Sequence, residues 1–362
     1  MRRKKVIALL LTGALISGGV ALGTEAGSID DPLITLNWLR STFIPTTVAA
    51  AEAQVDKRMD EFPQQVPSDG TIGVELRAKR GDIFQLASGA SLLSLAGSVS
   101  VTGDGTVIDL TVGEEVPLNI GSVAVKHRYL TAENTQAVFS ITSDTAVIRL
   151  IGPYQLIPSK ETDYNALAGA LKTMGLFRGS DVAYGSGYEL ESAPTRIQGL
   201  IMFLRLLGED AVAQAYPGSG ITFADVPEWA LPYAAYAYDR GYIKGRGVDS
   251  QWRVVFGASD LLTARDYMTF LLRALGYVEG SDFQWLSAVE DAQSIGVLTA
   301  GEKTLLSEKS FLRAQVVYLS YFSLSAKLAG EENSLLDRLI NKGTIDSNTA
   351  SSAMSSLAVE RL

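Results

Sequence analysis

The spacing of apolar residues changes near residue 164 from a period of two to a period of about 3.6. Between residues 71 and 157, short apolar and β-branched runs alternate with turns rich in Gly, Asp and Asn. The runs are Ile72–Leu76, Ser98–Thr102, Thr106–Leu110, Ala137–Thr142 and Ala146–Ile151. Strands at this spacing predict a small all-β domain over residues 71–157, built as a sandwich or a roll.

From residue 164 to about 330 the apolar residues recur at helical spacing, which predicts a mostly helical region. Four helix faces carry the pattern: Tyr164, Leu167, Ala168 and Leu171; Ile197, Leu200, Ile201 and Leu204; Tyr267, Phe270, Leu271, Ala274 and Leu275; and Val317, Tyr321, Leu324 and Leu328. The tail, residues 331–362, predicts a helical hairpin with a stop at Gly343, since glycine is favoured just past a helix end. The predicted fold class is therefore α+β.

The first 26 residues have the layout of a secretory signal peptide. Basic residues 2–5 precede an apolar run, Val6–Ala21, and small residues follow. This run is shorter than the roughly 20 residues that a membrane span needs, so an uncleaved anchor is the lesser alternative. Residues 27–70 predict a leader and linker with a short helix over residues 48–62 that ends before Pro63. We predict a secreted protein with no membrane attachment after cleavage.

The amino-acid composition excludes several classes of partner and of functional site. The chain has 362 residues, enough for two or three domains. Its 40 acidic and 31 basic residues give a net charge of -9, which argues against a nucleic-acid partner. There is no cysteine, and His127 is the one histidine, so disulfides and multi-histidine zinc sites are excluded. We predict no catalytic residue, no cofactor and no metal, and we place His127 on a partly exposed strand or loop.

The helical region contains an internal repeat, which decides the interpretation. Three units, over residues 164–210, 222–278 and 282–330, each run from a helix through a glycine turn and a loop to a second helix. The second helix opens with an arginine motif in every unit: Thr195-Arg196, Thr263-Ala264-Arg265 and Leu312-Arg313. Units that cannot close a core alone are expected to stack against one another.

The second unit makes the resemblance specific. Phe223-Ala-Asp225-Val-Pro-Glu-Trp229-Ala, then Gly241-Tyr-Ile-Lys-Gly245 and Thr263-Ala-Arg265, resemble the S-layer homology (SLH) domain of exported Gram-positive bacterial proteins. The resemblance covers residues 164–330. It implies a pseudo-threefold helical bundle whose grooves bind an anionic secondary cell-wall polysaccharide, often pyruvylated. It therefore implies non-covalent anchoring at the cell wall and cell surface, not catalysis.

The helix openings are the candidate contacts for an acidic sugar. Threonine is a favourable N-cap, the helix start presents free N–H groups, and a guanidinium takes a carboxylate with two parallel hydrogen bonds. We also expect the turn glycines to let a ligand approach the backbone, Asp225 to cap the next helix, and Trp229 to stack on a sugar ring. The candidate polysaccharide-binding residues are Arg196, Arg265, Arg313, Thr195, Asp225, Trp229, Gly241 and Gly245.

Each candidate has a purely structural alternative. The more frequent role of such glycines is to end a helix, and the more frequent role of Trp229, in line with Tyr233 and Tyr236, is to pack in the core. The arginines are equally expected to pair with Asp266 or other local acids. Arg265 also lies one position further into its helix than Arg196. Two other functions stay open: an envelope assembly protein whose degenerate units contact other envelope proteins, and a glycan-acting enzyme, for which no carboxylate pair is singled out.

Overall fold

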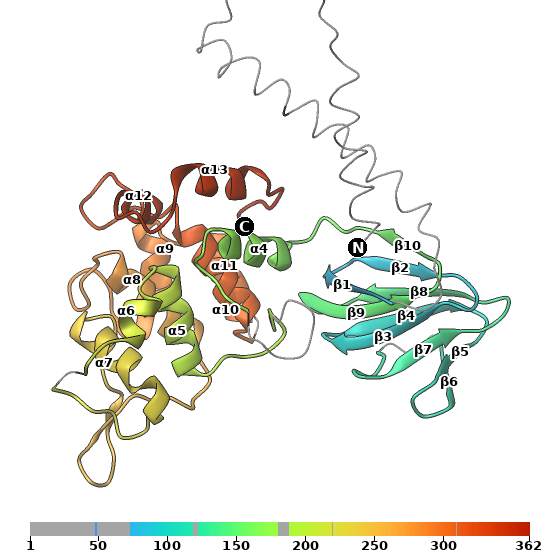
Figure 1. The fold of residues 1–362 in the computed structure, drawn as a ribbon, viewed down its shortest axis with the longest axis horizontal. Coiled ribbons are helices and arrows are strands. Elements are labelled where there is room, and N and C mark those ends of the chain that lie inside the picture. The colour runs from blue at the N-terminus through green and yellow to red at the C-terminus, as the bar shows by residue number, and fades with distance from the viewer. Residues whose placement is uncertain (1–47, 49–72, 119–121, 180–187, 219, 309) are drawn as a thin grey trace, which may run out of the picture. The chain divides into compact units, whose positions relative to one another are not determined.

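The computed structural model describes residues 48, 73–118, 122–179, 188–218, 220–308 and 310–362. The predicted signal peptide (residues 1–26) and all of the predicted linker helix except Val48 lie outside these residues. The described chain is α+β, as predicted, with strands over residues 74–157 and helices after them (Figure 1). Each part has its own hydrophobic core.

Ten strands form two antiparallel sheets in the first part of the described chain. One sheet has the order β1-β9-β3-β7-β5-β6, and the other has the order β10-β2-β8-β4. The strands are β1 Val74–Lys79, β2 Ile83–Leu86, β3 Ser91–Ala96, β4 Val99–Asp104, β5 Val107–Asp109, β6 Glu114–Val116, β7 Arg128–Thr131, β8 Gln136–Ile141, β9 Thr145–Ile151 and β10 Tyr154–Ile157.

Alternating side chains of the two sheets supply the first core. Along β8, Ala137, Phe139 and Ile141 are buried and the residues between them are more exposed, as period two requires. Where β4 pairs with the start of β8, Gly103 has a φ of 139°. A Cβ there would lie 2.0 Å from the Gln136 carbonyl oxygen, so this pairing requires glycine.

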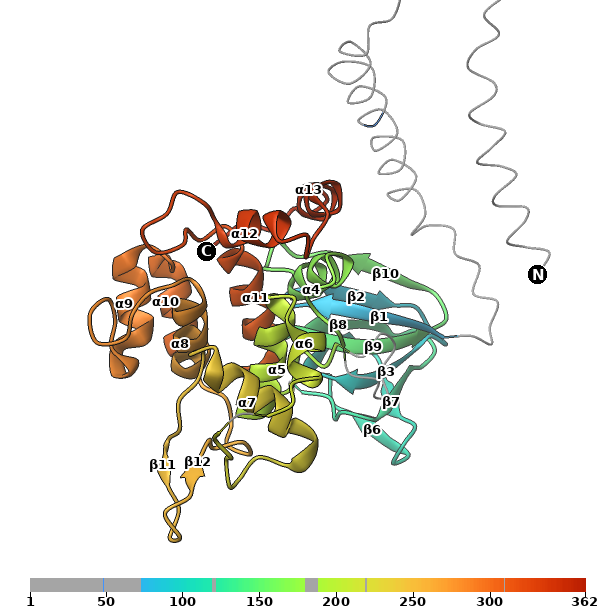
Figure 2. The same cartoon turned by 60° about the vertical axis from the view of Figure 1, so that its left-hand side comes forward.

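The second part of the described chain is helical, with one small hairpin. The α-helices are α4 Tyr164–Thr173, α5 Arg196–Leu206, α6 Asp210–Gln214, α7 Leu231–Asp239, α8 Ala264–Ala274, α9 Ala288–Ile295, α10 Ala300–Glu308, α11 Arg313–Ser323, α12 Leu335–Asn341 and α13 Ser347–Ser355. Two 3₁₀ turns, η3 Glu228–Ala230 and η4 Trp285–Ser287, precede α7 and α9. The hairpin of β11 Gly247–Val248 and β12 Val254–Val255 projects from this part (Figure 2).

Helices α5, α8 and α11 have 11 residues each and share the second core. Phe203 of α5 packs on the rings of Tyr267 and Phe270 of α8, at centroid distances of 6.5 and 5.6 Å. The Tyr267 hydroxyl is 2.6 Å from Ser320 Oγ on α11. Burial of Tyr267 raises the pKa of its hydroxyl, so this hydrogen bond joins neutral groups.

The first residues of α5 and α11 each make a backbone hydrogen bond to the segment that precedes another of these helices, at the same distance in sequence from its N-cap. Arg196, the first residue of α5, donates its N–H to the Asp260 carbonyl, three residues before the Thr263 N-cap of α8, at 2.8 Å. Arg313, the first residue of α11, donates its N–H to the Ser192 carbonyl, three residues before the Thr195 N-cap of α5, at 2.9 Å. The equivalent position before α11 is residue 309, which lies outside the described residues. The first residues of α5 and α11 therefore make the same kind of backbone contact, although threonine precedes Arg196 and leucine precedes Arg313.

The tail folds as two short helices. Ser334 caps α12 with a capping box, and Gly343, at a φ of 72°, follows its end at the predicted stop. Beyond α13, Arg361 reaches the fully buried Glu302 at the start of α10, with Nε at 2.8 Å. No helix in the described part of the chain has the length and apolar content to cross a membrane.

Candidate functional site

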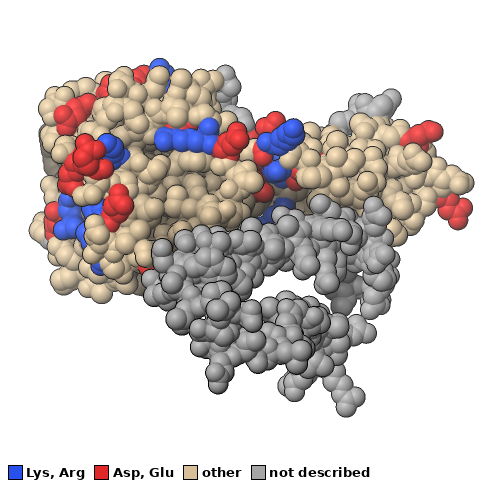
Figure 3. Space-filling view, turned by 90° about the horizontal axis from the view of Figure 1, so that it is seen from above, with Lys and Arg blue, Asp and Glu red and all other residues tan. Residues whose placement is uncertain are grey.

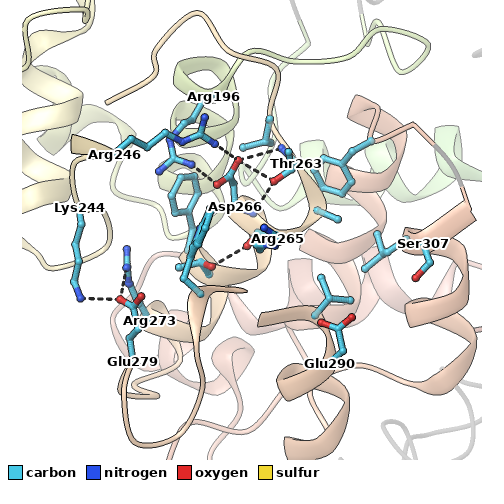
Figure 4. Close-up of a pocket in the computed structure, with 18 of the residues that line it drawn as sticks. Arg196, Lys244, Arg246, Thr263, Arg265, Asp266, Arg273, Glu279, Glu290 and Ser307 are labelled. Atoms are coloured by element: carbon cyan, nitrogen blue, oxygen red, sulfur yellow. Dashed lines mark hydrogen bonds and ion pairs between the residues drawn. The ribbon is translucent and has the colours of Figure 1, made fainter. Parts of the chain in front are cut away.

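A cavity of about 890 Å³ lies beside the first turn of α8 (Figure 4). It is bounded by the turn after α7, by α8 and η4, by α9 and α10, and by Phe311, two residues before α11. These segments belong to the second and third sequence units, and Arg196 at the start of α5 closes the inner end from the first unit. Its lining residues are Arg196, Lys244, Gly245, Arg246, Leu262, Thr263, Ala264, Arg265, Asp266, Thr269, Phe270, Arg273, Glu279, Trp285, Val289, Glu290, Leu306, Ser307 and Phe311.

The lining is locally positive in an acidic protein. Five cationic side chains and three carboxylates face the cavity, whereas the whole chain has a net charge of -9. On the face shown from above, acidic and basic side chains are interspersed, and neither sign forms a continuous patch there (Figure 3). The cavity therefore offers an anion a more favourable environment than that face does.

At the inner end of the cavity, the Arg196 side chain is engaged in contacts within the protein. Its guanidinium forms an ion pair with Asp266 and lies 4.7 Å from the centre of the Phe256 ring. Arg196 is 5% exposed and Asp266 is 0% exposed, so this pair is inside the fold. The prediction that Arg196 is open to a ligand carboxylate is therefore wrong, and the alternative of a local pair with Asp266 is confirmed.

Asp266 is held as an anion by several groups. Arg246 donates to it at 2.7 Å and Thr263 Oγ1 donates to it at 2.8 Å (Figure 4). Thr263 and Asp266 also form a capping box at the start of α8, in which each side chain accepts the other's backbone N–H. Burial alone would raise the pKa of Asp266, but Arg196, Thr263 and Arg246 outweigh it and lower that pKa. The cluster fixes the first turn of α8, from which Arg265 projects.

A second group of charges is paired at the rim. Lys244 and Arg273 both bind Glu279 Oε2, at 2.7 and 2.6 Å (Figure 4). Burial opposes ionisation of Glu279, but these two cations lower its pKa. Arg273 also donates to the Tyr242 carbonyl at 2.9 Å.

Arg265 is the exposed cation of the lining without a carboxylate partner among the described residues. It is the second residue of α8, and its guanidinium lies 5.0 Å from the centre of the Trp285 ring. A guanidinium over an aromatic face, beside the free N–H groups of a helix start, can bind a carboxylate with two hydrogen bonds. This is the group in the cavity that remains available to an anionic ligand.

Gly245 also lines the cavity. A Cβ at this position would lie 2.5 Å from Val254 Cγ1 and 3.3 Å from the Val255 carbonyl oxygen. The glycine therefore lets the hairpin pack closely at the edge of the cavity.

Five other candidates lie away from this lining, and four of them, Thr195, Gly241, Arg313 and Asp225, have a structural task. Thr195 is the N-cap of α5. Gly241 ends α7 at a φ of 75°, as the helix-end alternative predicted. Arg313 is buried and donates Nε to the Tyr188 carbonyl at 3.2 Å, and burial lowers its pKa. Its predicted role as an open guanidinium is wrong, because this environment encloses it.

The predicted capping role of Asp225 is also wrong. Its carboxylate accepts the backbone N–H groups of Phe256, Gly257 and Ala258, at 2.7, 2.6 and 2.8 Å. Burial raises the pKa of Asp225, but these three donors outweigh it and lower that pKa. Asp225 therefore holds the loop that leads to α8.

Trp229 is 62% exposed, so the alternative that it packs in the core is wrong. It lies in η3, before α7 begins at Leu231, and therefore does not continue the helical register of Tyr233 and Tyr236.

Several residues of the cavity were not predicted from sequence. Lys244 and Arg246 follow the helix-ending glycine of the second unit, and Glu279 follows the end of α8. Trp285 follows Phe283, in the weakest of the three units. The one available signal was the turn Gly241–Gly245, which places Lys244 beside a glycine that lines the cavity.

His127 has an acidic partner that sequence reasoning missed. Its Nδ1 is 2.6 Å from Asp109 Oδ2 on β5, and its ring stacks on Tyr129. Burial opposes ionisation of Asp109, but His127 and Thr111 lower its pKa. Within the described residues, no group of three or more His, Asp or Glu side chains is placed to hold a metal ion.

Comparison with known proteins does not identify a family. No protein-family model and no curated protein matches the chain. A solved structure with partial similarity is procruciferin, an 11S globulin from Brassica napus, at 13% sequence identity and a TM-score of 0.17. The match covers 28% of this chain and 27% of that chain. Similarity at this level carries no argument about fold or function.

Proposed function

We propose that this chain is a secreted, non-catalytic cell-envelope protein that binds an anionic secondary cell-wall polysaccharide through its SLH-like units. The observation that carries the proposal is Arg265, an exposed guanidinium stacked on Trp285 at a helix start, inside a cavity with a net positive lining. An acidic substituent, such as a pyruvate ketal, supplies the carboxylate for Arg265, and the sugar ring packs near the indole.

The repeated register at two helix junctions supports the same proposal. In both, the first residue of one long helix bonds to the segment before the next, which is how stacked equivalent units are joined. One groove, beside α8, carries the binding function. Arg196, at the inner end of the same cavity, and Arg313 do not contribute to binding, because both guanidinium groups are enclosed by the protein.

A second candidate function is envelope assembly through protein contacts. The observation that favours it is apolar exposure next to the cavity: Leu261 and Leu286, adjacent in sequence to lining residues, are both exposed. A protein partner would cover these leucines, whereas an acidic sugar would engage Arg265. The two functions therefore depend on different side chains.

The test is cosedimentation of the full chain with purified cell walls, before and after chemical removal of the non-peptidoglycan polymer. We expect binding to intact walls, loss of binding on stripped walls, and loss of binding by Arg265→Ala. Arg178→Ala is the matched control, because Arg178 is an exposed arginine outside the cavity lining. Equal binding to stripped walls contradicts the proposal. Wall binding that survives Arg265→Ala but is lost in Leu261→Ser/Leu286→Ser supports protein contacts.

A further inference from the structure

The β11–β12 hairpin displays an indole at its tip. Trp252 is 85% exposed and lies in the turn between Val248 and Val254. Its backbone has a φ of 61°, in the left-handed region that bulky residues rarely adopt and that glycine adopts readily. A large apolar side chain at a backbone position suited to glycine indicates that the side chain itself has a use.

The turn that carries Trp252 is held in a fixed shape. The Asp249 carboxylate accepts the backbone N–H groups of Gln251 and Arg253 at 2.8 and 2.9 Å, and Arg253 Nε at 2.8 Å. The Asp249 N–H donates to the Arg253 carbonyl at 2.9 Å. Because Asp249 and Arg253 neutralise each other, the indole is presented from a rigid tip with polar but uncharged surroundings.

The β11–β12 hairpin begins directly after two residues that line the cavity. Gly245 and Arg246 line that cavity, and the Arg246 N–H bonds to the Val255 carbonyl at 2.8 Å to begin the hairpin. Arg246 is also fixed by ion pairs with Asp260 and Asp266, both at 2.7 Å. The three residues from Arg246 to Asp249 span about 10 Å at roughly 3.3 Å per residue. The tip is therefore connected to the cavity lining by about 10 Å of extended backbone, and we expect a monosaccharide held at Arg265 to leave Trp252 uncontacted.

We propose that Trp252 is a second carbohydrate-binding site, which stacks on an uncharged sugar ring of the polymer whose acidic unit occupies the cavity. This inference rests on the proposed function. The apolar face of a pyranose ring matches an indole, which offers a large rigid contact at little entropic cost. The neutral tip favours a neutral ring over an anionic lipid surface, because such surfaces attract clusters of lysine and arginine.

The experiment compares a long and a short ligand by titration calorimetry with the full chain. The probes are a purified pyruvylated wall polysaccharide and a pyruvylated monosaccharide. The variants are Trp252→Ala, Trp252→Phe and Arg265→Ala. We expect Trp252→Ala to weaken polymer binding about two- to tenfold and leave monosaccharide binding unchanged, with partial recovery in Trp252→Phe. Arg265→Ala should weaken both.

Each other outcome overturns part of the account. Unchanged polymer affinity in Trp252→Ala overturns the second site alone, as does equal weakening of both ligands by that variant. Absence of binding of either probe to the wild-type chain overturns the proposed function and the second site together. Binding of anionic phosphatidylglycerol vesicles that is lost in Trp252→Ala, with polymer binding intact, replaces the sugar with a membrane surface as the partner of the tip. Thermal unfolding of each variant shows whether it is folded.

Discussion

One arginine of the cavity lining is buried in an ion pair and another is exposed, and substitution can tell their roles apart. Arg196 and Arg265 are 69 positions apart in sequence and both line the cavity. Arg196 is buried against Asp266, whereas Arg265 is exposed over Trp285. We expect Arg196→Ala to destabilise the protein and Arg265→Ala to leave its stability unchanged.

The expected change in the free energy of unfolding depends on whether the substitution leaves a buried charge without its partner. Removing one partner of a buried ion pair costs about 3–5 kcal/mol, because the remaining charge is buried without compensation. Asp266 keeps Arg246 and Thr263, so we expect the lower end, about 3 kcal/mol, for Arg196→Ala. Replacement of an exposed residue such as Arg265 is expected to change the free energy of unfolding by less than about 0.5 kcal/mol.

Thermal unfolding followed by circular dichroism measures the difference. For a domain of 150–250 residues each kcal/mol shifts the Tm by about 2–4 °C, so Arg196→Ala should lower it by about 6–12 °C. A double variant, Arg196→Met with Asp266→Leu, should recover part of the loss, since no buried charge is left unpaired at that position. If Arg196→Ala melts within 2 °C of the wild type, the buried pair with Asp266 does not stabilise the fold as described. An equal decrease in Tm for Arg265→Ala would show that the exposed arginine is structural as well.

The pH dependence of the same pair has a definite sign. The pKa of Asp266 is lowered in the folded protein, so its stabilising effect is present above the unfolded value of about 3.9. The effect is lost as the pH falls through the folded pKa. The stability difference between wild type and Arg196→Ala should therefore be constant near neutrality and shrink below about pH 4. A difference that grows on acidification contradicts this assignment.

Three further substitutions test contacts that hold the fold together, two in the helical part and one between β4 and β8. Arg361→Ala removes the cation beside the fully buried Glu302, so urea unfolding should show a loss of about 3 kcal/mol; an unchanged midpoint would mean that the pair is dispensable. Asp225→Ala leaves three backbone donors without their acceptor, and should cost at least about 1–3 kcal/mol in the same assay, with Asp225→Asn losing less; identical losses would argue against the hydrogen-bond explanation. Gly103→Ala places a Cβ 2.0 Å from the Gln136 carbonyl oxygen and should lower the Tm by about 4 °C or more. A Tm equal to that of the wild type would exclude the close approach of β4 and β8.

Periodicity predicted most of the secondary structure because it depends on neighbouring residues. The five predicted apolar runs overlap β1, β4, β5, β8 and β9, and the four predicted helix faces are buried. Strands such as β6 and β10 carry few buried side chains, so their alternation is weak in the sequence. The predicted helix face of Val317, Tyr321, Leu324 and Leu328 extends past the end of its helix, because α11 ends at Ser323. Leu324 and Leu328 are buried, but they lie after the helix.

The site was less predictable because burial and pairing depend on contacts between distant segments. The motif identified all three arginines, but sequence alone left open which of them meets an acid. Arg196 meets Asp266, 70 positions away, while Arg265, displaced by one position at the start of its helix, stays exposed. A triple replacement of the three arginines would therefore mix a folding defect with a binding defect.

The most direct test of the central claim is the crystal structure of the full chain with a pyruvylated saccharide bound. We expect electron density in the cavity beside α8, with the ligand carboxylate in hydrogen-bond contact with the Arg265 guanidinium and the sugar ring near Trp285. Crystals of Arg265→Ala grown with the same ligand should show no such density. A saccharide bound at another surface, or bound equally in Arg265→Ala, would contradict it.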